Sequence, residues 1–144
     1  GAAGPWLFDL PVDGGTKIFK GTLCTQLTAT GALVPYSTAA AGKVVGVAQH
    51  DADNSGGADG AQRCVVESGR VYIFDNGAGG DAFSEASLIG SAVYGTDDHT
   101  VADNSSTQTR EAIGFFMGME PDGRVRVLVV PWLNGIADAS LNPA

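Results

Sequence analysis

The sequence predicts an all-β protein, a small β-barrel or β-sandwich of short strands with extended arms at both ends. Its 144 residues are 44% hydrophobic and only 17% charged, and they include 21 glycines. That mixture is typical of many short strands joined by tight turns. The apolar runs are short, rich in β-branched or aromatic residues, and bounded by Gly, Asp, Asn and Ser. This is the pattern of strands rather than of helices.

A single barrel domain is expected over residues 17–130, between an N-terminal arm of residues 1–16 and a C-terminal arm of residues 131–144. The length of the chain suits one domain with one core. Within the domain, strands are predicted for residues 17–19, 22–27, 43–49, 62–68, 70–75, 91–94, 112–119 and 124–130.

Turn signals predict how neighbouring strands connect. Asp122-Gly123 is a tight-turn sequence, so residues 112–119 and 124–130 are expected to form a hairpin. Gly69 likewise predicts a hairpin between the strands at residues 62–68 and 70–75. The only helix-like possibility is a short turn at residues 84–89.

The arms hold large apolar side chains without a regular period. Trp6, Leu7 and Phe8 lie in the N-terminal arm, and Trp132 and Leu133 lie in the C-terminal arm, among Pro, Gly, Asn and Ser. Such side chains must be buried against something, because exposed tryptophans are costly. We expect these five residues to make contacts between chains; the alternative is that the arms fold back onto their own barrel.

The two halves of the predicted domain resemble each other, which indicates a duplicated β unit. The separation between matching segments shrinks along the chain, as it would if the first half held a longer loop. Chance similarity among strands rich in glycine and valine is the alternative. The matching segments are residues 21–24 with 90–93, 46–48 with 114–116, and 60–66 with 123–129.

Charge and hydropathy exclude two classes of partner. The net charge of −8 would repel a phosphate backbone, so direct nucleic-acid binding is not expected. No run approaches the roughly 18 consecutive apolar residues of a membrane span, so no membrane partner is expected. Cys24 and Cys64 each lie inside a predicted strand, where buried, reduced thiols are expected and a disulfide is the alternative.

Two acidic segments contain the residue types of cation sites. Residues 51–56 match the opening of a calcium loop, but the position of the bidentate acid is occupied by Gln62. Asp97, Asp98 and His99 are consecutive in a predicted turn, so their side chains should diverge. We interpret both segments as solvated loops and predict no metal and no cofactor; a weak cation site at residues 51–62 stays open as the alternative.

Motifs of common enzyme classes are not found. Serine never occurs as G-x-S-x-G, and the glycine-rich residues 76–80 lack the Lys-Ser/Thr of a phosphate-binding loop. The sequence therefore predicts no catalytic residue and no enzyme activity.

Several segments, taken in order, resemble a known family. Residues 42–48, residues 94–101 and residues 112–115 are similar to strands and turns of tailed-phage head decoration proteins, also called capsid cement or stabilisation proteins. The resemblance covers roughly residues 17–130 and leaves the arms unmatched. The sequence departs from the family pattern at Gly95 and His99, where larger apolar and glutamine-like residues are expected.

The resemblance implies a structural virion protein, a β-barrel homotrimer or in some relatives a dimer. Such a protein sits on the outer surface of a bacteriophage capsid, is assembled in the host cytoplasm, and cements neighbouring major-capsid subunits. The competing class is a trimeric receptor- or glycan-binding module of a virion spike or adhesin. Such a module should carry aromatic clusters on its loops, whereas the loops here are rich in Asp, Ser, Asn and Gly.

Overall fold

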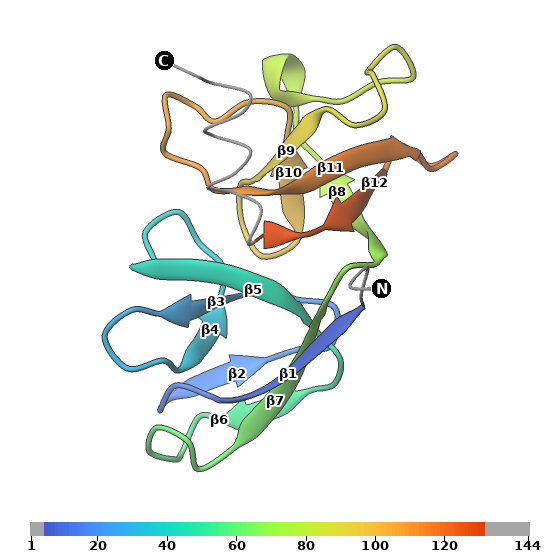
Figure 1. The fold of residues 1–144 in the computed structure, drawn as a ribbon. Helices are drawn as coiled ribbons and strands as arrows, with labels where there is room; N and C mark the ends of the chain where they lie inside the picture. The colour runs from blue at the N-terminus through green and yellow to red at the C-terminus, as the bar shows by residue number, and fades with distance from the viewer. Residues whose placement is uncertain (1–4, 132–144) are drawn as a thin grey trace.

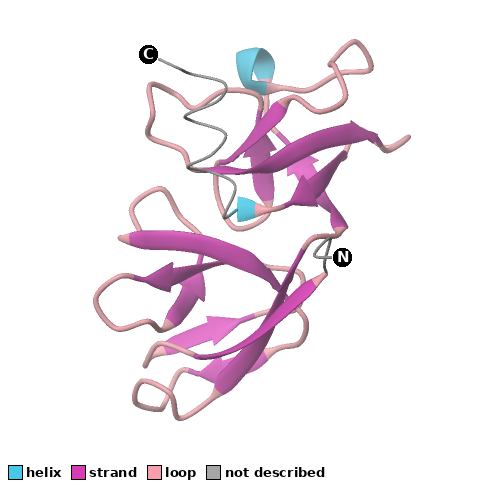
Figure 2. Ribbon diagram, in the orientation of Figure 1, coloured by secondary structure: helices cyan, strands magenta, loops and turns pink. Residues whose placement is uncertain are grey.

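The computed structural model describes residues 5–131, and the fold of this part of the chain is all-β, as the sequence predicts (Figures 1 and 2). The strands form two lobes, residues 6–68 and residues 71–129. A single 3₁₀ turn, η1 (Gly79–Asp81), interrupts the second lobe, and no α-helix occurs among the described residues. Across residues 5–131, no helix has the length and apolar composition to cross a membrane.

The first lobe is a five-stranded sheet flanked by a two-stranded one. A parallel bridge from Val12 to Leu33 joins the two edges of the larger sheet, which therefore curls nearly into a barrel. The larger sheet has the order β1 (Trp6–Pro11), β7 (Arg63–Ser68), β5 (Gly42–Ala48), β3 (Leu23–Leu27), β4 (Leu33–Pro35). The smaller sheet pairs β2 (Thr16–Ile18) with β6 (Ala52–Asn54).

The second lobe is a closed five-stranded barrel. Its closing pair is parallel and includes Val101 opposite Asn76, while the other pairs are antiparallel. The prediction of a small β-barrel is confirmed here. Around the barrel the order is β10 (Thr100–Ala102), β8 (Val71–Asn76), β12 (Val125–Val129), β11 (Ala112–Met119), β9 (Ala92–Gly95).

The two lobes repeat one strand arrangement. The order β1-β7-β5-β3-β4 of the first lobe corresponds to the order β8-β12-β11-β9-β10 of the second. In both lobes the strands pair antiparallel, and the first strand returns to the last through a parallel contact. The internal repeat that the sequence indicates is therefore present in the strand topology.

The register of the middle strands agrees with the sequence alignment. Gly46 of β5 lies opposite Cys24 of β3. Gly114 of β11 lies opposite Val93 of β9. In both lobes the register shifts next to this glycine pair. One shift lies between β3 and β5, and the other between β9 and β11. The glycines that align in the sequence are thus equivalent in space.

The register of the last strands corrects the alignment by two residues. Ala48 pairs with Val66 in the first lobe, and Phe116 pairs with Val127 in the second. Val66 therefore corresponds to Val127, whereas the sequence alignment matches it with Val129. The error arises because buried apolar residues recur at every second position of both strands, Cys64 and Val66 on β7 and Val125, Val127 and Val129 on β12. A shift by two residues therefore preserves the pattern of inward and outward side chains.

Connections differ in length between the lobes. In the first lobe β6 is inserted between β5 and β7, so this lobe does hold the longer loop. In the second lobe β11 and β12 form the predicted hairpin, with the Glu120 N–H donating to the Arg124 carbonyl at 2.8 Å. The two-stranded sheet is thus an addition to the shared arrangement.

The predicted hairpin across Gly69 is wrong. β7 pairs with β1 and β5, and β8 pairs with β10 and β12, so these consecutive strands do not pair with each other. Gly69 has a φ of +93°, and its N–H donates to the Val129 carbonyl at 2.7 Å. The turn therefore carries the chain from one lobe to the other.

The larger hydrophobic core contains side chains from both lobes. Leu23, Tyr36 and Val44 of the first lobe are buried in the same cluster as the interior of the barrel. Inside the barrel the rings of Phe83 and Phe116 stack with their centroids 4.7 Å apart. A second, smaller cluster fills the first lobe alone. Because the larger core takes side chains from both lobes, their relative position is fixed by packing.

Candidate functional site

The N-terminal residues predicted to contact other chains lie on β1, at one edge of the first sheet. Leu7 points outward and is 62% exposed. Phe8 is partly buried and packs against the smaller core. The Trp6 ring lies against Gly69, whose Cβ, if it had one, would be 2.9 Å from that ring. Trp132 and Leu133 lie outside the described residues.

The outer surface of the barrel carries an apolar face. Val71 on β8 pairs with Leu128 on β12, and Leu128 pairs with Phe115 on β11, so these three residues form a row across neighbouring strands. Val71 is 47% exposed, and Ile73 and Met117, each two residues further along β8 and β11, are 44% and 37% exposed. We call these five residues the apolar barrel face. Arg126 of β12 lies opposite Ile73 and forms an ion pair with Glu120, so a charged pair interrupts the apolar side chains of this face. Exposed apolar surface marks interaction sites.

A pocket of about 520 Å³ lies where the two lobes meet. The first lobe contributes residues between 36 and 40, which connect β4 to β5. The second contributes Tyr94 and residues between 105 and 112, most of which connect β10 to β11. These two connections are equivalent in the repeat. The inter-lobe pocket is thus formed by the same loop of each lobe.

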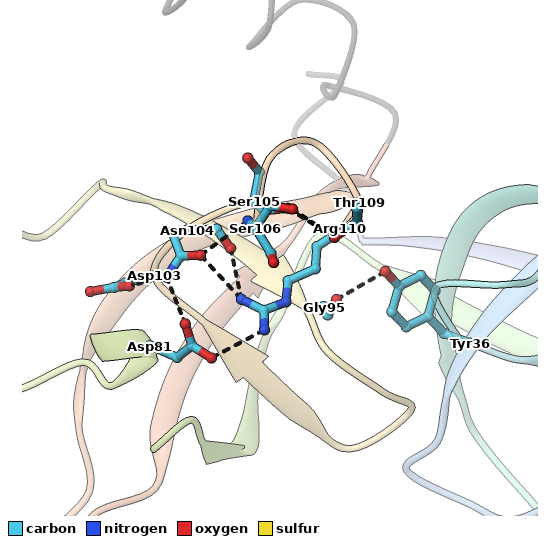
Figure 3. A network of polar contacts seen from close by, with 9 residues as sticks. All are labelled: Tyr36, Asp81, Gly95, Asp103, Asn104, Ser105, Ser106, Thr109 and Arg110. Carbon is cyan, nitrogen blue, oxygen red and sulfur yellow. Dashed lines mark hydrogen bonds and ion pairs between the residues drawn. The ribbon is translucent and has the colours of Figure 1, made fainter. Parts of the chain in front are cut away.

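Tyr36 forms the base of the inter-lobe pocket and ties the lobes together. Its side chain is 4% exposed. The hydroxyl donates to the Gly95 carbonyl at 2.9 Å (Figure 3). It also accepts from the Glu111 N–H at 3.2 Å. Gly95 has to be glycine, because a Cβ there would lie 2.6 Å from the ring of Tyr36. Burial raises the pKa of the Tyr36 phenol, which keeps it protonated as a donor.

Arg110 holds the loop at the rim of the pocket. Its guanidinium donates to Asp81 Oδ2 at 3.1 Å and to Asn104 Oδ1 at 3.2 Å (Figure 3). Asn104 in turn donates to Asp81 Oδ1 at 2.8 Å. The hydrogen bond from Arg110 holds the pKa of Asp81 below its usual value. The charge of Arg110 is therefore already compensated within the protein.

Three consecutive residues of this loop adopt a backbone conformation that favours glycine. Ser106, Thr107 and Gln108 have φ values of 49°, 61° and 65°. Hydrogen bonds fix them: Asn104 Oδ1 accepts from the Ser106 N–H at 3.0 Å and Ser105 Oγ accepts from the Gln108 N–H at 3.1 Å. Left-handed non-glycine residues cost of order 1 kcal/mol or more each and concentrate at functional sites.

Glu111 is the acidic group of the pocket. Its Oε2 accepts from the Val44 N–H at 2.9 Å, which joins the two lobes a second time. Burial raises the pKa of this carboxyl, although the hydrogen bond from Val44 and the charge of Lys43 act in the opposite direction. Like Arg110, Glu111 is engaged by the protein itself.

The calcium-like segment uses its oxygen atoms to hold the backbone. Asp51 Oδ1 accepts from the Lys20 N–H at 2.8 Å, and Asp59 Oδ1 accepts from the Gly14 N–H at 2.8 Å. Asp53 Oδ1 accepts from both the N–H and the hydroxyl of Ser55. These bonds explain why an acidic, glycine-rich sequence occurs here without any of the helices that flank a calcium loop.

Asp97, Asp98 and His99 lie closer together than the sequence predicts. One oxygen from each carboxylate and one imidazole nitrogen lie within 4.8 Å of one another. His99 Nδ1 is 2.8 Å from Asp98 Oδ1, and that hydrogen bond raises the pKa of the imidazole. The three residues form an exposed turn whose groups satisfy one another.

Both cysteines are free and buried, in agreement with the favoured prediction. Cys24 lies on β3 and Cys64 on β7, in the smaller core of the first lobe. Burial raises the pKa of the Cys64 thiol. Neither thiol has the environment of a reactive cysteine.

Comparison with known proteins identifies no relative. No family model, no curated protein and no solved structure matches this chain. Function therefore has to be argued from the surfaces described above.

The inter-lobe pocket was missed in the sequence because its walls come from distant segments. Tyr36 and Glu111 are separated by 75 positions, and only the repeat brings their loops together. One sequence feature could have indicated the pocket. Residues 104–109 are rich in hydroxyl and amide side chains. They follow residues 94–101, one of the segments that resemble decoration proteins.

Proposed function

We propose that the chain is a structural virion protein that binds the outer surface of a tailed-phage capsid and cements neighbouring major-capsid subunits. Its partners in this role are the major capsid protein and further copies of itself, arranged as a homotrimer. The observation that carries the proposal is the apolar barrel face, a surface suited to burial against another protein.

The apolar barrel face supports a protein partner because of its shape and composition. It runs over three adjacent strands, and beside it Leu88 and Ile89 are 76% and 64% exposed. The side chain of Ile89 reaches to 4.0 Å from the position of a Cβ at Gly118 of β11, so the loop and the strand adjoin. A sheet face is rigid, which lowers the entropy cost of binding many copies in register.

The sequence resemblance supports the same role. Residues 42–48 form β5, the middle strand of the first lobe, and residues 94–101 form the turn between β9 and β10. The segments on which the resemblance depends are therefore framework elements of the two lobes. The net charge of −8 suits a protein on the outside of a particle, away from the packaged DNA.

The proposal is tested with expanded, undecorated heads of the phage that encodes the chain. The native mass is first measured by light scattering, where a homotrimer is expected. The protein is then mixed with the heads and sedimented, and we expect saturable binding that raises the melting temperature of the heads. Protein that stays in the supernatant at every ratio would exclude the cement function.

A double variant, Val71→Glu with Ile73→Glu, tests the apolar barrel face. Both side chains point outward, so the fold should survive while binding to the heads is lost. Thr28→Glu is the matched control, because it adds a carboxylate at an exposed position of the first lobe. If the double variant binds heads as tightly as the control, the contact surface lies elsewhere. The apolar barrel face would then no longer support the cement function.

A further inference from the structure

The inter-lobe pocket has the features of a ligand site that the cement function does not use. It lies at the junction of two structural units, where small-molecule sites occur most often. Its volume of about 520 Å³ is within the range of roughly 300–1,000 Å³ that is typical of such sites. Its walls come from residues 36–40, Tyr94 and residues 105–112, and none of these residues belongs to the apolar barrel face.

The walls of the pocket are fixed before any ligand arrives. Tyr36 is held at its hydroxyl by Gly95 and Glu111. The opposite loop is closed by the Ser105 carbonyl, which accepts from the N–H groups of both Thr109 and Arg110. Strained loop residues persist only when their surroundings hold them in place. A site that is already ordered loses little conformational entropy on binding.

The polar groups that face the pocket are neutral and available. Ser37, Thr38 and Gln108 line it, and within residues 5–131 their side chains make no hydrogen bond. The Tyr94 hydroxyl is likewise without a hydrogen-bond partner within that range. Hydroxyl and amide groups both donate and accept, so they match a ligand whose own groups do the same.

The charged groups of the pocket disfavour an anionic ligand. Arg110 is paired with Asp81 at 3.1 Å, and Glu111 adds a carboxyl group to the wall. A phosphate or carboxylate would have to displace Asp81 from Arg110 and approach a protein of net charge −8.

An apolar surface completes the site. Tyr94 is partly buried and lies in the pocket wall beside Ala40 and Ala112. An aromatic ring with a polar tip packs against C–H groups while its hydroxyl stays hydrogen-bonded. Sugars present that combination, a face of C–H groups ringed by hydroxyls. We propose that the inter-lobe pocket binds a neutral oligosaccharide.

The test is binding of the full-length protein to an array of immobilised glycans that includes neutral and sialylated members. We expect binding to neutral glycans, with Tyr94→Ala weakening the affinity for the best of them at least about tenfold in calorimetry. Gln108→Ala provides a second variant at an exposed position, where folding is not at risk. Phe19→Ala is the matched control, because Phe19 is an aromatic side chain, 55% exposed, in the first lobe.

Three outcomes would overturn the proposal: binding to no glycan on the array, binding only to acidic glycans, or binding that Tyr94→Ala and Gln108→Ala leave unchanged. The result is independent of the cement function. Saturating sugar should not release the protein from phage heads, and the Val71→Glu and Ile73→Glu double variant should bind the glycan as the unmodified chain does.

Discussion

Gly46 and Gly114 occupy the same position in the two lobes and meet the same obstacle there. A Cβ atom on Gly46 would lie 2.6 Å from the carbonyl oxygen of Glu67, and one on Gly114 would overlap the carbonyl oxygen of Leu128. Glu67 and Leu128 are themselves equivalent residues of β7 and β12. Both lobes therefore need glycine on the middle strand, because the neighbouring backbone approaches too closely for any side chain.

Replacing Gly114 should destabilise the protein strongly. Gly114→Ala forces the backbones of β11 and β12 apart, and we expect a loss of about 3 kcal/mol in the free energy of unfolding, measured by urea denaturation. Gly80→Ala is the control, because a Cβ at Gly80 would meet no atom within 4 Å. It should change stability by less than about 0.5 kcal/mol. Similar effects of the two substitutions would contradict the close approach.

Removing one hydroxyl should weaken the junction between the lobes. Tyr36→Phe leaves the Gly95 carbonyl and the Glu111 N–H without the partner they share. Because these groups are buried or nearly so, we expect a loss of about 1–3 kcal/mol, measured by thermal or urea unfolding. Tyr94→Phe removes a hydroxyl that has no hydrogen-bond partner within residues 5–131, and it should be nearly neutral. Equal losses would mean that the Tyr36 bonds contribute little.

Two arginines should differ in their importance although both form ion pairs. The Arg110 side chain is 14% exposed and binds both Asp81 and Asn104, whereas the Arg124 side chain is 48% exposed and pairs with Asp122 alone. Exposed pairs contribute little to stability. Arg110→Ala should therefore lower the urea midpoint clearly more than Arg124→Ala.

The effect of Arg110 can also be measured on the pKa of the Asp81 carboxyl. In Arg110→Ala the pKa of Asp81 should rise toward its ordinary value, which nuclear magnetic resonance would report as a shift of the titration midpoint. An unchanged Asp81 titration in Arg110→Ala would show that the guanidinium is not the cause of the lowered pKa.

Glu111 should make stability fall with rising pH. Its pKa is raised in the folded protein above its ordinary value of 4.5, so between the two values the folded state binds more protons than the unfolded state. Stability is then lost as pH rises through that window. Glu111→Gln keeps an oxygen that can accept from Val44 and removes the titration. The stability of this variant minus that of the unmodified chain should increase from pH 4 to pH 7 in urea titrations; a constant difference would refute the assignment.

Much of the fold could be predicted from short-range pattern. The alternation of arginine and valine at residues 124–127 marks β12, and Asp122-Gly123 marks its hairpin with β11. The repeat was visible because the glycines that allow a close approach between strands, Gly46 and Gly114, recur in both halves. By contrast β4, β6 and β10, for which no strand was predicted, have three residues each. Strands that short carry no periodic signal and exist because a partner strand lies beside them.

The N-terminal segment shows a second reason why a strand can be missed in the sequence. Residues 6–11 were predicted as part of an extended arm, and they are extended, but they pair along their whole length with β7. The side chains of Trp6 and Phe8 alternate with the exposed Leu7, which is a strand pattern that prolines and glycines on either side obscure. Contacts of Trp6, Leu7 and Phe8 with other chains stay a prediction.

The shared core has a consequence for a lobe on its own. A unit of about 60 residues buries only about 60% of its surface on folding and is marginal alone, and here Leu23 and Val44 of one lobe complete the interior of the other. A chain with one lobe alone would need a second copy of itself to fill that interior, so we expect an isolated lobe to fold only as a homodimer. In the present chain the surface that such a dimer would share is internal. The lobes differ beyond it, since one carries β2 and β6 and the other closes its barrel.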